Sequence, residues 1–182
     1  TQAYGGLNQW LTQVINIATG NLDKEGGSLF TLAAVDQVET TGPGGFARHH
    51  SRVRGLPEFD RELPAAAMAE EITTPGEGQV RALFTGAGNP VLSTPNGRQL
   101  DEALEQLEFM VSLDPFINET TRHADIILPP TSPLEHDHYD IAFHTLAIRN
   151  TARFSEPVFE KPEGALHDWE IFTELGNRVA KL

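Results

Sequence analysis

The fold of this chain is decided by residues 79–129, whose sequence is QVRALFTGAGNPVLSTPNGRQLDEALEQLEFMVSLDPFINETTRHADIILP. Three short runs rich in apolar residues lie in this stretch, at 80–85, 109–113 and 125–129, and each has the length of a buried strand. The first run ends at a glycine-rich loop, and the other two end at prolines, which cannot continue a central strand. The chain must therefore leave the sheet after each run.

The segments between these strands have helical patterns. Apolar residues recur at the spacing of an amphipathic helix from Asn96 onward, with either Thr94-Pro95 or Asn96 at its start: they are Leu100, Ala103, Leu104 and Leu107. Residues 118–123 fit one or two further helical turns, capped by Asn118. Strands that alternate with helices imply right-handed crossovers. The expected fold class is α/β, a Rossmann-like parallel sheet flanked by helices, with long irregular loops.

Outside this core, a helix is expected at 5–19, a second begins at Pro64, and a third closes the chain at 168–180. Residues 28–63 and 130–166 show little periodicity. We therefore expect a single α/β domain over 1–182, with its core at 79–135. Because the chain starts without methionine and runs straight into a helical pattern, we expect it to be a fragment of a larger subunit.

Composition excludes several classes of partner and site. With 26 acidic and 13 basic residues the net charge is −13, which opposes binding to a phosphate backbone, so no nucleic-acid partner is expected. The absence of cysteine excludes disulfides, thiolate zinc sites and iron–sulfur ligation within the chain. No apolar run approaches the roughly 20 residues of a membrane span. We expect a cytoplasmic protein, with the periplasm as the alternative compartment.

Several phrases, in this order, resemble one enzyme family. Residues 16–23 read NIATGNLD and precede Gly26 and Gly27, and the first core strand leads into Gly88-Asn89-Pro90. FMVSLD, then ET, ADIILP and Glu135 follow within 109–135, and HDWEI stands at 167–171. This succession resembles the molybdopterin oxidoreductases of the dimethyl sulfoxide reductase family, which includes formate dehydrogenases and nitrate reductases. The resemblance covers nearly the whole chain. The residues after Glu135 depart from the formate dehydrogenase pattern, which argues against formate as the substrate.

The resemblance implies a fragment of a catalytic subunit, its third domain, which binds the guanosine and phosphate part of one molybdopterin guanine dinucleotide. In such enzymes two of these dinucleotides hold one molybdenum, which tungsten can replace. Iron–sulfur clusters, where such enzymes have them, and the metal-ligating residue lie outside the matched region. The implied partners are the other domains of the same subunit and an electron-transfer subunit. The parent is expected to be an oxidoreductase, and the isolated fragment is expected to be inactive.

On this resemblance, the cofactor contacts are expected at the carboxyl ends of the three strands. Small loop residues permit close approach to a nucleotide, and the helix from Asn96 adds its positive end. A carboxylate at Asp114 could accept hydrogen bonds from both adjacent N–H donors of guanine. We expect no catalytic residue and no metal ligand in the chain. The expected cofactor-binding residues are Gly86, Gly88, Asn89, Pro90, Ser93, Thr94, Asp114, Asn118, Thr131 and Glu135.

Plainer interpretations compete with each contact. The glycine loop could be a turn, Asp114 before proline is a common turn residue, and Asn118 could serve only as a helix cap. Residues 135–144 are rich in histidine and aspartate, but their spacing fits no established zinc signature, so we interpret them as a solvated loop. The basic cluster at 48–54 is likewise interpreted as a surface loop.

Two other functions remain open. A free-standing α/β domain that binds an ordinary nucleotide without redox chemistry would need the same glycine loop and strand-end aspartate. An interaction domain without catalysis is suggested by the apolar opening helix and the long loops.

Overall fold

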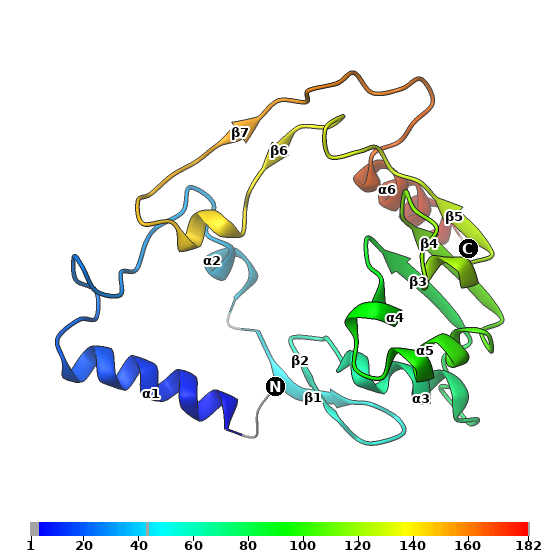
Figure 1. The fold of residues 1–182 in the computed structure, drawn as a ribbon, viewed down its shortest axis with the longest axis horizontal. Helices are drawn as coiled ribbons and strands as arrows, with labels where there is room; N and C mark the ends of the chain where they lie inside the picture. The colour runs from blue at the N-terminus through cyan, green and yellow to red at the C-terminus, as the bar shows by residue number, and fades with distance from the viewer. Residues whose placement is uncertain (1–3, 43, 182) are drawn as a thin grey trace. The chain divides into compact units, whose positions relative to one another are not determined.

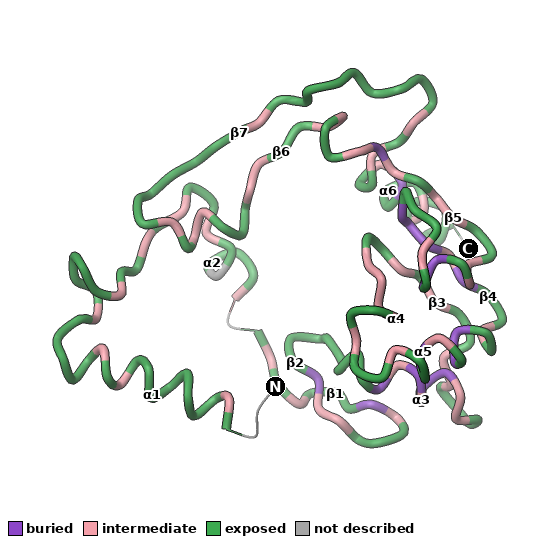
Figure 2. The backbone as a smooth tube through the Cα atoms, in the orientation of Figure 1, coloured by how far each residue is buried: buried purple, intermediate pink, exposed green. Residues whose placement is uncertain are grey.

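The computed structural model describes residues 4–42 and 44–181. The described residues form two compact units: those of Thr1–Gly42 and His138–Ser155 make the first, and those of Pro43–Asp137 and Glu156–Leu182 the second. The single domain over 1–182 stays a prediction. Buried residues gather in the second unit, and none of the described side chains of the first is buried (Figure 2).

The second unit contains the expected parallel sheet. Its strands are β3 (Ala82–Gly86), β4 (Phe109–Leu113) and β5 (Ile126–Leu128), hydrogen-bonded in that order (Figure 1). β3 and β4 pair in parallel from Ala82 opposite Phe109, and β4 and β5 pair in parallel up to Leu113 opposite Leu128. All three strands thus end at one edge, which we call the carboxyl edge and which comprises residues 86–93, 114–121 and 129–135.

Helices pack on both faces of this sheet. Leu83 of β3 packs against the buried apolar cluster of α3 (Met68–Thr73) and α5 (Gly97–Leu104). Its neighbour Phe84 contacts Phe172 of α6 (Asp168–Val179), with ring centroids 5.6 Å apart. Because successive strand residues point to opposite faces, α6 lies on the face opposite α3 and α5. The described chain is therefore α/β, with helices flanking a parallel sheet.

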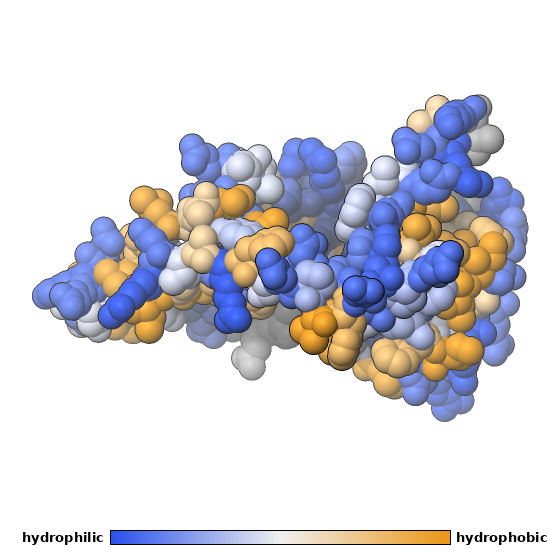
Figure 3. All heavy atoms as spheres, turned by 90° about the horizontal axis from the view of Figure 1, so that it is seen from above, coloured by the Kyte–Doolittle hydropathy of each residue, from blue (hydrophilic) through white to orange (hydrophobic). Residues whose placement is uncertain are grey.

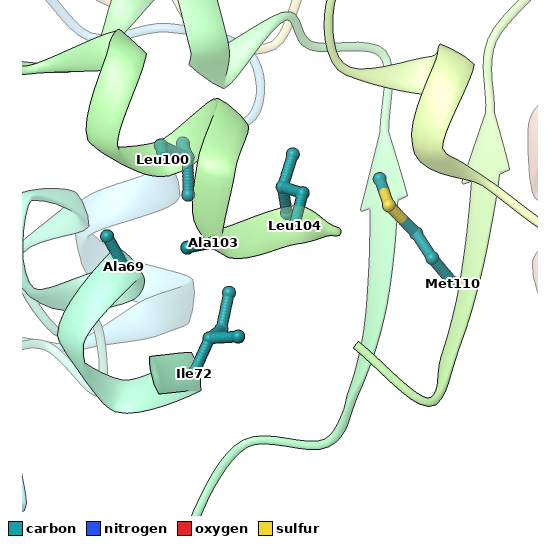
Figure 4. Close-up of a cluster of buried hydrophobic side chains, with 6 residues drawn as sticks. All are labelled: Ala69, Ile72, Leu100, Ala103, Leu104 and Met110. Carbon is teal, nitrogen blue, oxygen red and sulfur yellow. The ribbon is translucent and has the colours of Figure 1, made fainter. Parts of the chain in front are cut away.

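The hydrophobic core lies between α3, α5 and the sheet. Its side chains point toward one another in Figure 4 and are those of Ala69, Ile72, Leu100, Ala103, Leu104 and Met110. Leu100, Ala103 and Leu104 are three of the four positions that helical spacing placed on the inner face of α5. Burial of these apolar side chains at the helix–sheet contact stabilises the second unit.

A polar pair crosses the sheet itself. The hydroxyl groups of Thr85 on β3 and Ser112 on β4 lie 2.7 Å apart and share a hydrogen bond. Ser112 is fully buried. The two residues are direct neighbours in the parallel pairing, so the hydrogen bond satisfies a hydroxyl that water cannot reach.

The segment expected to be irregular before the core contains an antiparallel hairpin of β1 (Phe46–His50) and β2 (Pro57–Phe59). The sequence did not predict it. The arginines of the basic cluster face carboxylates of the same unit: Arg48 pairs with Glu58 at 3.7 Å, Arg52 with Glu71 at 3.3 Å, and Arg54 with Glu70. Much of the positive charge of this cluster is thus neutralised internally.

Glu58 is the most buried of these carboxylates, with 1% of the residue exposed. Burial alone would raise its pKa. The backbone N–H groups of Arg48 and Arg61 donate to the carboxylate at 3.0 and 3.4 Å, and with the charge of Arg48 they hold the pKa of Glu58 below its ordinary value. The side chain therefore anchors the hairpin as an anion.

The helices of the second unit begin and end close to the predicted positions, with one addition. Pro64 precedes the 3₁₀ turn η1 (Ala65–Ala67) and α3, and η2 (Thr121–His123) lies where helical turns were expected. The short helix α4 (Pro90–Ser93) follows the glycine loop directly, ahead of α5. Asn96 occupies the cap position of α5 in a left-handed conformation, but its side chain makes no cap hydrogen bond.

The first unit is built from α1 (Gly5–Ala18), α2 (Gln37–Thr41), the 3₁₀ turn η3 (Phe143–Leu146) and the antiparallel pair β6 (His138–Tyr139) and β7 (Phe154–Ser155). The Thr31 hydroxyl donates to the Thr145 carbonyl at 2.8 Å, which ties its two segments together. The apolar stripe of α1 is exposed, with Trp10 61% accessible. Apolar side chains remain at the surface of both units (Figure 3).

No helix in the described part of the chain is both long enough and apolar enough to cross a bilayer.

Candidate functional site

A cavity of about 290 Å³ opens at the carboxyl edge of the sheet. The ends of β3 and β4 and the segment after β5 line one side of it. The opposite side is lined by α6 and by the loop before His138. We call it the edge cavity. The lining residues are Gly86, Ala87, Leu113, Pro115, Pro130, Thr131, Pro133, His136, Asp168 and Phe172.

The glycine loop forms one wall. A Cβ built on Gly86 would just contact the Phe172 ring, at 3.4 Å, so a side chain larger than alanine at this position would press on α6 and narrow the cavity. Ala87 has a left-handed backbone, with φ of 51°, which is uncommon for a residue with a side chain. Its N–H donates to the Leu113 carbonyl at 2.9 Å, which fixes the loop to the end of β4.

The next two amides of the loop are unused by the protein. Among the described residues, no acceptor takes the N–H groups of Gly88 and Asn89. Pro90 follows and starts α4. The loop therefore offers two neighbouring donors beside the cavity, the kind of group that binds phosphate oxygens.

The side chain of Asn89 points to the turn after β4. Its Nδ2 donates to Glu119 Oε2 at 2.7 Å, and its Oδ1 accepts from the Thr120 hydroxyl at 2.7 Å. Thr120 also accepts from the N–H of Val91 at 3.1 Å. Asn89 thus uses both ends of its amide to hold the loop in place.

Asp114 lies at the end of β4 and is 8% exposed. Its Oδ1 accepts from the Phe116 N–H at 2.8 Å, and its Oδ2 accepts from Asn118 Nδ2 at 3.3 Å. Each carboxylate oxygen has two lone pairs, so the group retains acceptor capacity. Asn118 Oδ1 accepts from the N–H groups of Thr120 and Thr121 at 3.0 and 2.9 Å. Asn118 therefore caps the turn and also touches Asp114.

The segment after β5 contributes Thr131 to the edge cavity. Its hydroxyl lies 2.7 Å from Nδ1 of His167, the residue before α6, and its N–H donates to the Leu166 carbonyl. Glu135 turns back on its own loop, where Oε2 accepts from the Ser132 N–H at 2.8 Å. The Thr131 contacts tie the end of β5 to the start of α6.

Ser93 and Thr94 use their hydroxyls within α4, donating to the carbonyls of Asn89 and Pro90. Thr94 lines a different cavity, together with Arg54 and the first residues of α5. The start of α5, which we expected to face the ligand, therefore borders that second cavity.

Of the ten predicted contacts, the structure places Gly86 and Thr131 in the lining of the edge cavity, and Gly88, Asn89, Pro90, Asp114 and Asn118 in the loop and turn beside it. The other lining residues were not among the expected contacts, and three of them, His136, Asp168 and Phe172, lie outside the loops that follow the strand ends. The two on α6 are about 80 residues from the glycine loop in sequence, and no local pattern links them. His136 was set aside as part of a solvated loop.

A charged cluster holds the turn after β4 against α5. The carboxylate of Asp101 lies 2.6 Å from His123 Nε2 and accepts from Arg122 at 2.6 Å, and these hydrogen bonds lower the pKa of Asp101. The hydrogen bond from Asn89 lowers the pKa of Glu119, so Glu119 is an anion at neutral pH. Among the described residues, no three histidine, aspartate or glutamate side chains are grouped as metal ligands.

Comparison with known proteins identifies the family. The family model described as molybdopterin oxidoreductase matches residues 2–178. The chain is 32% identical over 134 residues to the assimilatory nitrate reductase catalytic subunit of Bacillus subtilis, which covers 73% of this chain and 18% of that protein. It is 26% identical over 172 residues to the F420-dependent formate dehydrogenase subunit alpha of Methanocaldococcus jannaschii, covering 88% and 25%.

Formate dehydrogenase H of Escherichia coli is 33% identical over 103 residues, 56% of this chain and 14% of that protein. The chain thus spans between 14% and 25% of the length of these three relatives. Because the family model covers nearly all of the sequence, the likeness extends to both units. The chain belongs to the molybdopterin oxidoreductase family.

Proposed function

We propose that this chain is part of the catalytic subunit of a molybdenum oxidoreductase, and that its carboxyl edge binds the guanosine and phosphate part of one molybdopterin guanine dinucleotide. One observation carries the proposal: a chain of this family has a cavity at the carboxyl ends of its parallel strands, bounded by the glycine loop. Open α/β sheets bind ligands in that position.

The residues present suit the two ends of such a ligand. The unused N–H groups of Gly88 and Asn89 are donors for a diphosphate, and the small residues Gly86 and Gly88 leave room for it. Asp114 can accept from the two adjacent N–H donors of guanine, a pair that adenine lacks. Asn118 and Thr131 lie beside these groups as further polar contacts.

The size of the cavity sets how much of the cofactor it can hold. Pockets that enclose drug-sized ligands run from roughly 300 to 1,000 Å³. At about 290 Å³, the edge cavity suits a nucleoside with a phosphate and is too small for a complete pterin dinucleotide. The pterin and the metal would then lie against other parts of the subunit.

The role of the carboxyl edge is to bind and orient the cofactor, whose molybdenum, when bound, supplies two-electron redox chemistry. In this proposal the other domains of the subunit provide the metal ligand, and an electron-transfer subunit or an iron–sulfur cluster in the same subunit carries electrons away. The isolated chain would then be inactive with any substrate.

The test uses the complete polypeptide that contains this chain, purified with its cofactor. We expect molybdenum or tungsten by elemental analysis, and guanosine monophosphate after acid hydrolysis, in a ratio of two nucleotides to one metal atom. Exchanging Gly86 for Val should lower both contents, whereas the same exchange at the exposed Gly176, where an added Cβ meets nothing within 4 Å, should not. A polypeptide that contains neither metal nor guanine nucleotide, or that binds ATP or NAD without preference for guanine, would contradict the proposal.

A further inference from the structure

We infer that Thr120 is the positioning residue of the carboxyl edge: its buried hydroxyl sets where the glycine loop meets the nucleotide. This inference deepens the proposed function and rests on it for the identity of the ligand. Its structural part, the control of the loop by Thr120, is independent of any ligand. Thr120 acts through its contacts with Asn89 and Val91, and we expect no direct contact between Thr120 and the nucleotide.

The turn that carries Thr120 is held from two sides. Asn118 accepts from the backbone N–H groups of Thr120 and Thr121 and donates to Asp114, which ties the turn to the end of β4. On the other side, Arg122 and His123 bind the carboxylate of Asp101 on α5. The turn is therefore a fixed point relative to both the sheet and the helix.

The hydroxyl group of Thr120 connects this turn to the glycine loop. The Thr120 Oγ1 donates to Asn89 Oδ1 at 2.7 Å and accepts from the Val91 N–H at 3.1 Å. Thr120 is 0% exposed. The hydroxyl itself is thus closed off from water, and its removal leaves the Val91 N–H and Asn89 Oδ1, both in half-buried residues, without this partner.

The neighbouring loop residues are those whose amides have no protein acceptor. Thr120 holds the loop at the Asn89 side chain and at the Val91 N–H, and on the other side of Gly88 the N–H of Ala87, in its left-handed conformation, donates to the Leu113 carbonyl. The short stretch with free N–H groups is thus fastened at both ends. A ligand that uses these amides binds donors that are already oriented, which lowers the entropy lost on binding.

The functional assignment of Asn89 follows from the same contacts. Both ends of its side-chain amide are occupied, by Thr120 and by Glu119 at 2.7 Å. We therefore assign the Asn89 side chain to the loop support and its backbone N–H, which has no acceptor among the described residues, to the ligand.

The experiment compares three variants of the complete polypeptide, prepared without cofactor and titrated with guanosine diphosphate as the probe. Thr120→Val keeps the shape of the side chain and removes the hydroxyl, and Thr120→Ser restores it. Thr73→Val is the matched control, because the Thr73 hydroxyl donates to the Ala69 carbonyl within α3, away from the carboxyl edge. All titrations are made well below the lowest unfolding midpoint of the set.

We expect Thr120→Val to weaken the binding of guanosine diphosphate by about tenfold or more, the factor that roughly 1.4 kcal/mol produces. Thr120→Ser should stay within about twofold of the wild type, as one pair of hydrogen bonds is restored, and Thr73→Val should be unchanged. Equal affinity in Thr120→Val and the wild type, or an equal loss in Thr73→Val, would overturn the inference.

A second measurement needs no ligand. Amide hydrogen exchange on the same proteins should be faster in Thr120→Val at Val91, whose N–H donates to the Thr120 hydroxyl, and unchanged there in Thr73→Val. Unchanged exchange of the Val91 amide in Thr120→Val would overturn the inference whatever the titrations give. If the exchange changes as expected but the wild type binds no guanosine diphosphate, the proposed function fails and the positioning of the loop by Thr120 stands.

Discussion

Replacement of Asp114 by asparagine should abolish the preference for guanine with little effect on the fold. The carboxylate accepts from the Phe116 N–H through Oδ1, and asparagine keeps an oxygen for this bond. The second oxygen becomes an NH₂ group, which cannot accept from guanine and cannot accept from Asn118 Nδ2, so the 3.3 Å hydrogen bond to Asn118 is lost as well. Alanine is a poorer choice, since it would also leave the Phe116 N–H without an acceptor, at a further cost of about 1–3 kcal/mol.

The size of the effect follows from the number of hydrogen bonds lost. Hydrogen bonds to a charged group contribute about 1.5–3 kcal/mol each, and at least one of the two to guanine disappears in Asp114→Asn. We therefore expect the dissociation constant for guanosine diphosphate to rise about 10- to 150-fold, which corresponds to roughly 1.5–3 kcal/mol. Inosine diphosphate lacks the 2-amino group, so Asp114→Asn should weaken its binding much less than that of guanosine diphosphate.

Isothermal titration of the cofactor-free complete polypeptide measures both dissociation constants. The wild type should prefer guanosine over inosine diphosphate, and Asp114→Asn should bind them about equally. Asp60→Asn serves as the matched control, because Asp60 is an exposed aspartate after β2. If Asp114→Asn retains the wild-type ratio of the two affinities, Asp114 does not contact the base and the proposed orientation of the nucleotide is wrong.

Three further predictions concern the second unit. Ile72→Ala should lower the free energy of unfolding of the second unit by about 2–5 kcal/mol in urea titrations, because Ile72 lies in the core and is 1% exposed. The control Ile117→Ala, at an 80% exposed position, should change this free energy by less than about 0.5 kcal/mol. Asp101→Asn should be less stable than the wild type at neutral pH, because folding lowers the pKa of Asp101 and the ionised carboxylate therefore stabilises the fold. This contribution to the free energy of unfolding is present above the ordinary pKa of 3.8 and is lost as the pH falls through the pKa of the folded state. Urea midpoints of the two proteins should therefore converge in acid, and a gap that persists there would contradict this origin. Ala87→Gly should raise the free energy of unfolding by roughly 0.5–1 kcal/mol in thermal unfolding, because glycine adopts the left-handed backbone without strain. An unfolding midpoint below that of the wild type would show that the φ of 51° at Ala87 costs nothing.

The sequence predicted the sheet well because its signals are local. The run Phe109–Leu113 is bounded by Asp114-Pro115, and the structure places β4 at those five residues. The spacing of Leu100, Ala103 and Leu104 identified the inner face of α5, and all three are buried. Proline and helical periodicity act within a few residues of the features they determine, so one sequence suffices to read them.

The remaining features depend on contacts between distant segments. The hairpin β1–β2 was missed because its strands read FARHH and PEF, without the alternation of apolar and polar residues that marks a strand. The burial of Glu58 depends on backbone N–H groups that the fold brings to it. The far wall of the edge cavity was missed for the same reason, since Phe172 contacts β3 only through the tertiary packing of α6.

The hydroxyl pair inside the sheet has a consequence for folding accuracy. Apolar strands of similar composition could slide past one another by two residues and still keep the same faces buried. Such a slip would move Thr85 away from Ser112 and leave a hydroxyl in the fully buried interior with no partner. The hydrogen bond between these two hydroxyl groups thus disfavours misaligned strand pairings that burial of apolar side chains alone would allow. It also fixes the position along β3 at which the glycine loop begins.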